Sequence, residues 1–270
     1  MPLTAHLEEL RWRILKSLFA VGLGFAASYA FSDRLFAFLA APLRARNPTP
    51  VTLIGTGVAE AFFTKVKVGI LAGIFFASPV ILYQAWQFVA PGLFEHEKRY
   101  ARPFVAFGTL FFLLGAAFCY LVIFPVGFAF FLDEFRTLGA EPAIRMSEYL
   151  TFSSRLLLAF GVTFELPVAT FFLARIGLVD HRTLLRFARY AVVLVFVVAA
   201  VLTPPDVVSQ FLMAVPLLVL YFLSVGVAYV AARNRARDHS TSEPDSSSKA
   251  RKSQSEPRSP GSSTTSHGSS

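Results

Sequence analysis

Three glutamates are placed where a carboxylate could bind a cationic ligand, because apolar sequence lies close to each of them. Glu9 lies in the N-terminal segment, Glu97 follows the second apolar run, and Glu165 lies in the middle of the fourth. Carboxylates bind guanidinium groups well, through bidentate and charge-assisted hydrogen bonds. The same spacing offers each of the first two a structural alternative, since Glu9 precedes Arg13 by four residues and Glu97 lies near Arg102.

Glu165 differs from the other two because apolar residues surround it on both sides. An ionised side chain at the centre of a bilayer costs roughly 3 kcal/mol or more on insertion scales, so such a residue usually faces a cavity or a partner. Pro167 follows two residues later and disturbs the backbone hydrogen bonds of that turn. The structural alternative is therefore a neutral Glu165 that bonds a carbonyl freed by the proline.

A third polar group occurs at the turn between the last two apolar runs. Thr203 and Gln210 could hydrogen-bond a polar residue of a neighbouring membrane helix, and such contacts contribute about 0.6 to 2 kcal/mol. Helix capping is the alternative, with Thr203 at the end of one helix and Asp206 at the start of the next. For Asp206 we favour capping, whereas Gln210 stays open between the two interpretations.

Six apolar runs must position these residues, and about 20 apolar residues suffice for a helix to span a membrane. The runs cover residues 14–31, 66–89, 104–132, 149–176, 190–202 and 207–230. We therefore predict an all-α, polytopic membrane protein with about six transmembrane helices, of which the last two are short.

The fifth run holds only about 13 residues at the usual rise of 1.5 Å each, which is too few for an ordinary span. Pro204 and Pro205 stop it firmly. It is either a buried re-entrant hairpin or a true span across a locally thinned bilayer. An even number of crossings favours the second interpretation, and the distribution of Lys and Arg favours cytoplasmic N- and C-termini.

The end of the chain has a different composition from the rest. Overall, 55% of the residues are hydrophobic and 16% are charged, yet the residues from 233 to 270 are mostly Ser, Lys, Arg, Pro and Glu. Such a segment cannot bury enough apolar surface to offset its chain entropy. We predict a transmembrane domain over residues 1–232 and a disordered cytoplasmic tail over residues 233–270.

Two shorter patterns add detail to the spans. Ser32 begins a segment that we expect to form a short surface helix through Leu39, ended by Pro42. Gly69 and Gly73 form a GxxxG pair, which lets helix backbones approach closely.

Several function classes are excluded by what the sequence lacks. It contains no Walker-type phosphate loop and no nucleophile paired with a base, so we expect neither an enzyme nor a cofactor or metal site. The net charge of +8 comes from short basic clusters between apolar runs, which are typical of membrane anchors rather than of a nucleic-acid surface. Cys119 is alone in an apolar run and is interpreted as a packing residue.

Six strings together make the chain resemble the TatC family, the multi-spanning subunits of the twin-arginine protein translocase. They are HLEELRWR at 6–13, APL at 41–43, SPVILYQ at 78–84, FVAPGLFEHEKR at 88–99, FGVTFELP at 160–167 and LTPPDVVSQ at 202–210. They occur in the order of the family and cover roughly residues 6 to 229. The paired arginines usual after the loop glutamate appear here as Lys98 and Arg99, a departure that keeps the charge.

The resemblance implies a receptor that binds signal peptides with two adjacent arginines. It implies that Glu97 and Glu9 receive the arginines, and that Phe88 and Leu93 shape the same surface, although Phe88 alone would be read as an interfacial anchor. Glu165, Thr203 and Gln210 would contact the transmembrane helices of partner proteins. Pro42, Pro79, Pro204 and Pro205 are interpreted as structural.

The family also implies partners and a location. These are single-span proteins of the TatA and TatB type, the lipid bilayer of the cytoplasmic membrane, and further copies of the chain, with the proton-motive force driving transport of folded proteins. The main alternative is a secondary transporter of a small solute, which would also use an intramembrane carboxylate near a proline. We find no inverted repeat and no second intramembrane acid in its support. A structural scaffold is the other alternative, and it predicts that Glu97 is replaceable.

Overall fold

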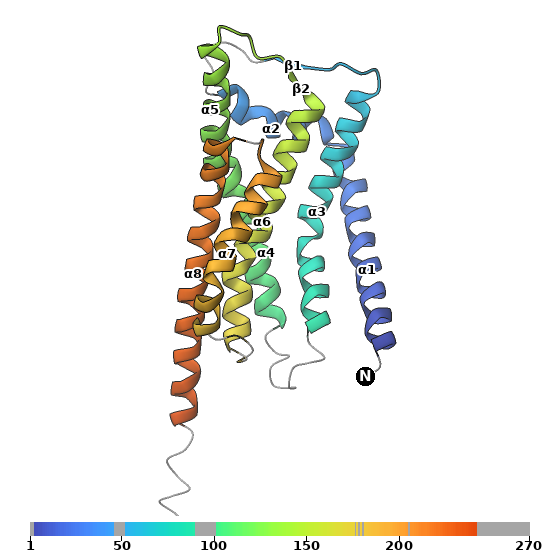
Figure 1. Ribbon diagram of the computed structural model, residues 1–270. Coiled ribbons are helices and arrows are strands. Elements are labelled where there is room, and N and C mark those ends of the chain that lie inside the picture. Colours follow the sequence, from blue (N-terminus) through green and yellow to red (C-terminus); the bar gives the residue numbers. More distant parts are fainter. Residues whose placement is uncertain are drawn as a thin grey trace, which may run out of the picture.

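The computed structural model describes residues 3–45, 52–89, 101–175, 177, 179, 181–204 and 206–241, and shows long helices running along a common axis (Figure 1). The helices are α1 (Leu3–Tyr29), α2 (Ser32–Ala45), α3 (Glu60–Val89), α4 (Ala101–Phe118), α5 (Phe124–Thr137), α6 (Met146–Arg175), α7 (His181–Leu202) and α8 (Val207–Thr241). A π-helical turn, η3 (Cys119–Ile123), joins α4 to α5, so that Arg102–Thr137 forms one continuous apolar span.

The predicted all-α membrane fold is confirmed. In the described part of the chain, five helical spans, α4 to α5 counted as one, are long and apolar enough to cross a membrane, and α1 with α2 makes a sixth candidate, bent by 89° between the two. We call the end where α1 begins and α3 ends the terminal end, and the opposite end, which carries α2, the cap end (Figure 1). Helix α8 also finishes at the terminal end, so both ends of the described chain lie on one side.

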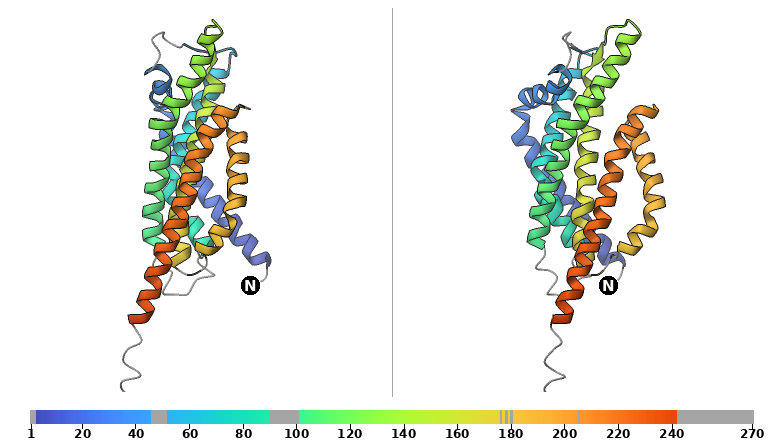
Figure 2. Two further views of the ribbon diagram at one scale, coloured as in Figure 1. Left: turned by 60° about the vertical axis from the view of Figure 1, so that its left-hand side comes forward. Right: turned by 90° about the vertical axis from the view of Figure 1, so that its left-hand side faces the viewer.

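Helix α7 corrects the predicted length of the fifth span. It begins at His181 rather than near Tyr190 and has 22 residues, because the turns carrying Arg182, Arg186 and Arg189 are helical although they are not apolar. The turn between α7 and α8 nevertheless lies well short of the level that α5 reaches at the cap end (Figure 2). Among the described residues of α7 only Ala199 is buried, so this helix sits at the edge of the bundle.

Helix α8 also extends further than the sequence suggested. It continues to Thr241, past the predicted boundary at residue 232. Residues 242–270 of the predicted tail lie outside the described part of the chain, and the division into two regions stays a prediction.

Glycines set the close approach of α1 to α3, as the GxxxG pair predicts. A Cβ atom on Gly73 would lie 2.8 Å from the Val21 carbonyl oxygen and from the Phe25 backbone nitrogen of α1. A Cβ atom on Gly24 would likewise lie 2.8 Å from the Gly73 carbonyl oxygen. Only glycine fits on both sides of this crossing, which fixes the position of α1.

The prolines inside helices leave carbonyl groups that other side chains satisfy. We expected Pro42 to end α2, but it lies within the last turn of this helix. Because Pro42 has no N–H, the carbonyl four residues earlier loses its usual donor, and Phe38 O instead accepts a hydrogen bond of 2.7 Å from the Tyr120 hydroxyl. Pro79 lies within α3 in the same way.

The carbonyl that Pro79 frees is that of Phe75, and the Ser78 hydroxyl donates to it at 2.8 Å. In both cases, at Pro42 and at Pro79, a side-chain hydroxyl donates to the carbonyl that the proline leaves free. Helix α3 can continue through the membrane because a neighbouring hydroxyl replaces the lost backbone donor.

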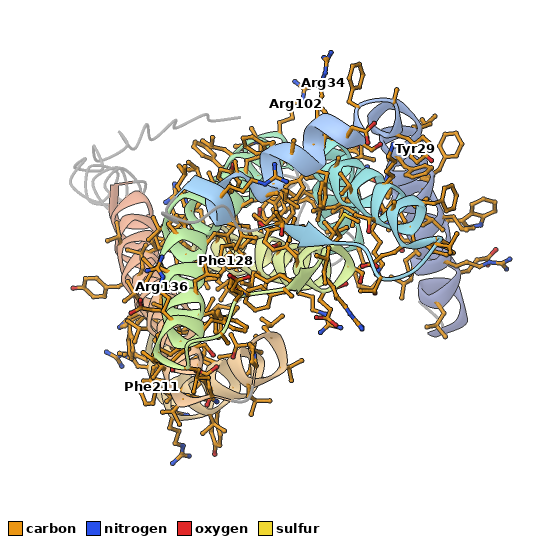
Figure 3. The ribbon with its side chains drawn as sticks, turned by 90° about the horizontal axis from the view of Figure 1, so that it is seen from above. Tyr29, Arg34, Arg102, Phe128, Arg136 and Phe211 are labelled. Carbon is orange, nitrogen blue, oxygen red and sulfur yellow. The ribbon has the colours of Figure 1, made fainter. Side chains whose placement is uncertain are left out.

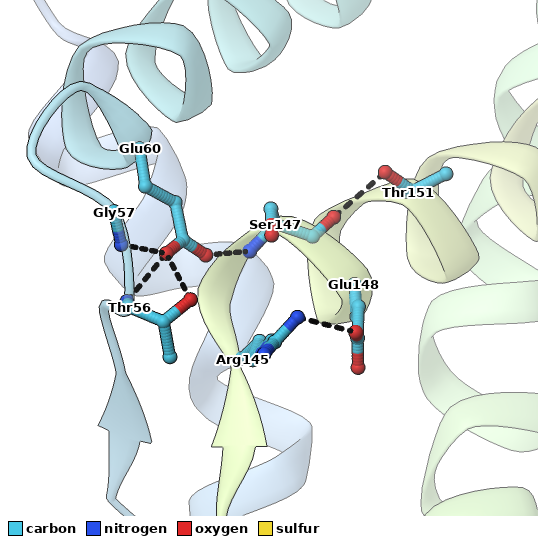
Figure 4. Close-up of polar contacts among 7 residues, drawn as sticks. All are labelled: Thr56, Gly57, Glu60, Arg145, Ser147, Glu148 and Thr151. Atoms are coloured by element: carbon cyan, nitrogen blue, oxygen red, sulfur yellow. Dashed lines mark hydrogen bonds and ion pairs between the residues drawn. The ribbon is translucent and has the colours of Figure 1, made fainter.

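The cap end is held together by a short parallel strand pair and one carboxylate. Strand β1 (Leu53–Ile54) pairs with β2 (Ile144–Arg145). Glu60 Oε2 accepts hydrogen bonds from the backbone N–H groups of Thr56 and Gly57, at 2.6 and 3.2 Å, and Oε1 accepts one from Ser147 N at 3.0 Å (Figure 4). Glu60 therefore joins the start of α3 to the start of α6.

The main buried cluster lies between α3, η3, α5 and α6, on the cap side of the bundle. Its largest fully buried side chains include Phe124, Phe160, Leu43 and Leu150, and Cys119 is buried in the same cluster. The Tyr149 hydroxyl donates a 2.6 Å hydrogen bond to Leu39 O, which attaches α2 to this cluster.

Candidate functional site

Glu9 lies at the terminal end and belongs to a polar chain that connects α1 to α3. It forms an ion pair with Arg13, the alternative that the spacing offered. Arg13 Nη1 also donates to Gln87 Oε1 at 2.9 Å, and Gln87 Nε2 donates to the Tyr83 hydroxyl at 2.5 Å. The Arg13 side chain is only 13% exposed, whereas that of Glu9 is 30% exposed. The Glu9 carboxylate is therefore partly exposed and is held in position by Arg13.

Of the other predicted signal-peptide residues, only Phe88 belongs to the described chain, and it lies at this end. Phe88 is half-buried in the last turn of α3. Leu93 and Glu97 lie outside the described residues. The helices that flank their segment, α3 at Val89 and α4 at Ala101, both have these ends on the terminal side, where α1 begins (Figure 1).

Close packing of α4 on α6 fixes the position of Glu165. A Cβ atom on Gly115 would lie 2.6 Å from Phe160 O, and one on Gly161 would lie 2.7 Å from the Phe112 ring. One further step along the same crossing, a Cβ atom on Gly108 would lie 3.0 Å from Glu165 Oε2. The carboxylate of Glu165 therefore lies directly against the backbone of α4.

Glu165 is half-buried, and its two buried carboxylate oxygens lack the hydrogen bond that the structural alternative required. Neither of its carboxylate oxygens has a hydrogen-bond partner among the described residues, so it does not bond a carbonyl freed by Pro167. The buried oxygens of Gln84 and Thr109, on the adjoining helices α3 and α4, also have no partner in the described chain. Buried polar groups are nearly always hydrogen-bonded in folded proteins, so these three residues are candidates for a polar ligand group or for water.

The turn between α7 and α8 uses its polar residues within the chain. Thr203 Oγ1 donates to Ala199 O at 2.9 Å, and Asp206 Oδ1 accepts from Ser209 N at 2.6 Å. These are the capping roles, and the interpretation of Asp206 as a cap is confirmed. Gln210 Nε2 donates to Phe196 O at 3.1 Å, which ties α8 to α7.

The prolines of this turn are only partly described. Pro204 O accepts a 2.7 Å hydrogen bond from Asp206 N, as expected for a structural proline in a tight turn. Pro205 lies outside the described residues. Contact of Thr203 and Gln210 with a partner helix stays a prediction.

Two groups of functional interest escaped the sequence reasoning. The Glu60 network was missed, because Glu60 follows Thr56 by four residues, whereas a capping box has its glutamate three residues after the threonine. A polar recess that contains Lys67 and Arg155 was also missed, because the sequence does not show that α3 and α6 bring these two residues together. Over the described part of the chain, no three His, Cys, Asp or Glu residues could hold a metal ion together.

Comparison with known proteins agrees with this architecture. The family model described as Sec-independent protein translocase protein (TatC) matches residues 5–216. The TatC protein of Desulforapulum autotrophicum is 46% identical over 238 residues, which are 88% of this chain and 87% of the relative. The TatC protein of Helicobacter pylori strain J99 is 40% identical over 243 residues, covering 88% and 94% of the two chains.

A solved structure has the same fold. The crystal structure of a twin-arginine translocase receptor, TatC, superimposes with a TM-score of 0.76 at 38% identity and covers 84% of this chain and 99% of that one. A second crystal structure of such a receptor, TatC in DDM, superimposes with a TM-score of 0.76 at 37% identity. The chain therefore belongs to the TatC family and is a membrane-embedded component of the Sec-independent protein translocase.

Proposed function

We propose that this protein is the receptor subunit of a twin-arginine translocase. It binds the paired arginines of signal peptides at its terminal end, with Glu97 and Glu9 as the acidic groups and with Phe88 and Leu93 beside them. The observation that carries the proposal is the family match over residues 5–216, together with the 38% identity to a crystallised twin-arginine translocase receptor.

The geometry around Glu9 suggests how an arginine is received. Glu9 already binds one guanidinium, that of Arg13, and Arg13 has a second acceptor in Gln87 at 2.9 Å. A peptide guanidinium that takes over the Glu9 carboxylate leaves Arg13 bonded to Gln87. The exchange keeps both charges hydrogen-bonded, which lowers its cost at a partly buried site.

The proposal places the terminal end in the cytoplasm, with both termini on that side of the cytoplasmic membrane. The Lys and Arg clusters near Arg11, Lys98, Arg186 and Arg235 then lie inside, as the positive-inside rule requires. Signal peptides approach from the same compartment, so the receptor surface faces its ligand.

The proposal also assigns partners to the membrane flank. Glu165, unpartnered against α4, would receive a polar group from the helix of a TatA- or TatB-type protein, and Thr203 and Gln210 would contact such a helix at the other edge. Further copies of the chain complete the complex, and the proton-motive force drives transport of the folded substrate. No cofactor is needed for these roles.

Binding of a synthetic twin-arginine signal peptide to the purified full chain tests the receptor role. Glu97→Gln should abolish binding, because it removes one charge-assisted site for the peptide arginines, and should leave the thermal stability unchanged. Glu95→Gln, two residues away, is the matched control, and a peptide with two lysines controls for charge alone. Unchanged affinity in Glu97→Gln would overturn the assignment.

A further inference from the structure

A polar recess opens on the flank of the bundle between α3, α6 and the turn from α7 to α8. It has a volume of about 480 Å³. Lys67 and Arg155 supply its cations, and Thr151 and Thr203 supply hydroxyl groups. Leu202 and the exposed Val201 continue its wall onto the apolar surface of α7.

The two cations lie deep relative to the ends of their helices. Lys67 follows Glu60, the first residue of α3, by seven residues, and Arg155 follows Met146, the first of α6, by nine. At 1.5 Å per residue these positions are about 10 and 14 Å from the helix ends. A cation at such a depth in plain hydrocarbon costs up to about 3 kcal/mol, so each needs a counter-charge or water.

The described chain supplies no counter-charge for either cation. Arg155 is exposed and forms no ion pair with a described carboxylate, and Lys67 Nζ reaches only the neutral hydroxyl of Thr151, at 3.4 Å. Glu148 also lines the recess, but its carboxylate is 3.5 Å from Arg145 Nη1 (Figure 4). The recess is therefore cationic.

We propose that this recess binds the phosphate group of a phospholipid from the leaflet at the cap end. Phosphate accepts several charge-assisted hydrogen bonds, and the ammonium group of Lys67 and the guanidinium group of Arg155 can donate them. The apolar continuation over Leu202 and Val201 gives the acyl chains a surface, which a free anion would not require.

The bound lipid has a consequence for the short hairpin. Thr203 and Pro204, at the turn of α7 and α8, line the same recess as the two cations. A lipid headgroup bound there places the interface between headgroups and hydrocarbon at the level of this turn. Helices α7 and α8 then cross a bilayer that is locally thinned to fit them.

Lipid retention by the purified full chain tests the proposal. Phosphatidylglycerol is titrated into the detergent-solubilised protein, and bound lipid is counted by native mass spectrometry. The double variant Lys67→Gln, Arg155→Gln should bind at least about tenfold more weakly than the parent chain, since two charge-assisted contacts are lost. The variant Arg155→Lys, which keeps the charge, should retain most of the affinity.

Matched controls separate this site from general attraction to anionic lipid. Arg34 is an exposed arginine of α2 that points away from the bundle (Figure 3), and Arg34→Gln should bind as the parent does. Diacylglycerol, which has the chains without the phosphate, should not be retained. Equal affinity of the parent and the double variant would overturn the proposal, as would equal loss in Arg34→Gln. Displacement of the lipid by millimolar inorganic phosphate would show a free-anion site and refute the lipid assignment.

Discussion

Replacing Gly73 with alanine tests whether the α1–α3 crossing holds the proposed arginine-binding surface in place. The added methyl group would lie 2.8 Å from the Val21 oxygen and the Phe25 nitrogen, which are backbone atoms of α1 and cannot rotate away. Ordinary contacts between such atoms are about 3.5 Å or longer, so α1 has to move outward by at least about half an ångström. Overpacking of this kind costs about 1–3 kcal/mol.

The same displacement should weaken peptide binding. Arg13 of α1 and Gln87 of α3 are joined across this interface by one hydrogen bond of 2.9 Å, and Glu9 is held by Arg13. Moving α1 outward strains that bond and loosens the Glu9 carboxylate. We expect a lower melting temperature for the full chain in detergent, by about 2–4 °C for each kcal/mol, and a weaker affinity for a twin-arginine peptide.

Gly22 provides the control, because a Cβ atom there meets nothing within 4 Å. Gly22→Ala should keep or raise the stability, since alanine favours a helix over glycine by up to about 1 kcal/mol. If Gly73→Ala melted at or above the temperature of Gly22→Ala, the reasoning from close backbone approach would be refuted.

Three further substitutions test separate contacts. Tyr149→Phe removes the buried donor to Leu39 O and should cost about 1–2 kcal/mol in thermal unfolding; a neutral result would show that this carbonyl needs no second donor. Asp206→Ala removes the cap of α8 and should cost about 1 kcal/mol, with Asp206→Asn nearly restoring stability; equal loss in both would point to charge instead of capping. Glu165→Ala should impair transport in a vesicle assay far more than peptide binding, and parallel loss of both activities would contradict the proposed partner-helix role.

The number of spans could be predicted because hydropathy reports directly on burial in lipid. The length of α7 could not be predicted in this way. Its first turns carry Arg182 and Arg186, so the helix begins several residues before the apolar run does. Pro42 was misjudged for a different reason. Its effect on α2 depends on Tyr120, a residue far away in sequence that satisfies the freed carbonyl.

In the candidate site, too, contacts between residues close in sequence could be predicted, whereas contacts between distant residues could not. The Glu9–Arg13 pair follows from spacing and was offered by the sequence, but the bond from Arg13 to Gln87 joins residues 74 positions apart. The contact of Glu165 with Gly108 likewise depends on which faces of α4 and α6 meet. Helix periodicity does not contain this information, because it identifies an apolar face and not the partner of that face.

Helix α3 is the element that connects these features. It carries Glu60 at the cap end, Gly73 at the crossing with α1 and Gln87 at the terminal end, over a length of about 45 Å at 1.5 Å per residue. Leu82, between them, lies 3.1 Å from the Cβ position of Gly108, beside the Glu165 carboxylate. Because Ser78 satisfies the carbonyl freed at Pro79, the helix crosses the membrane unbroken. The backbone of α3 thus connects its crossing with α1, near the proposed peptide-binding end, to the packing around Glu165.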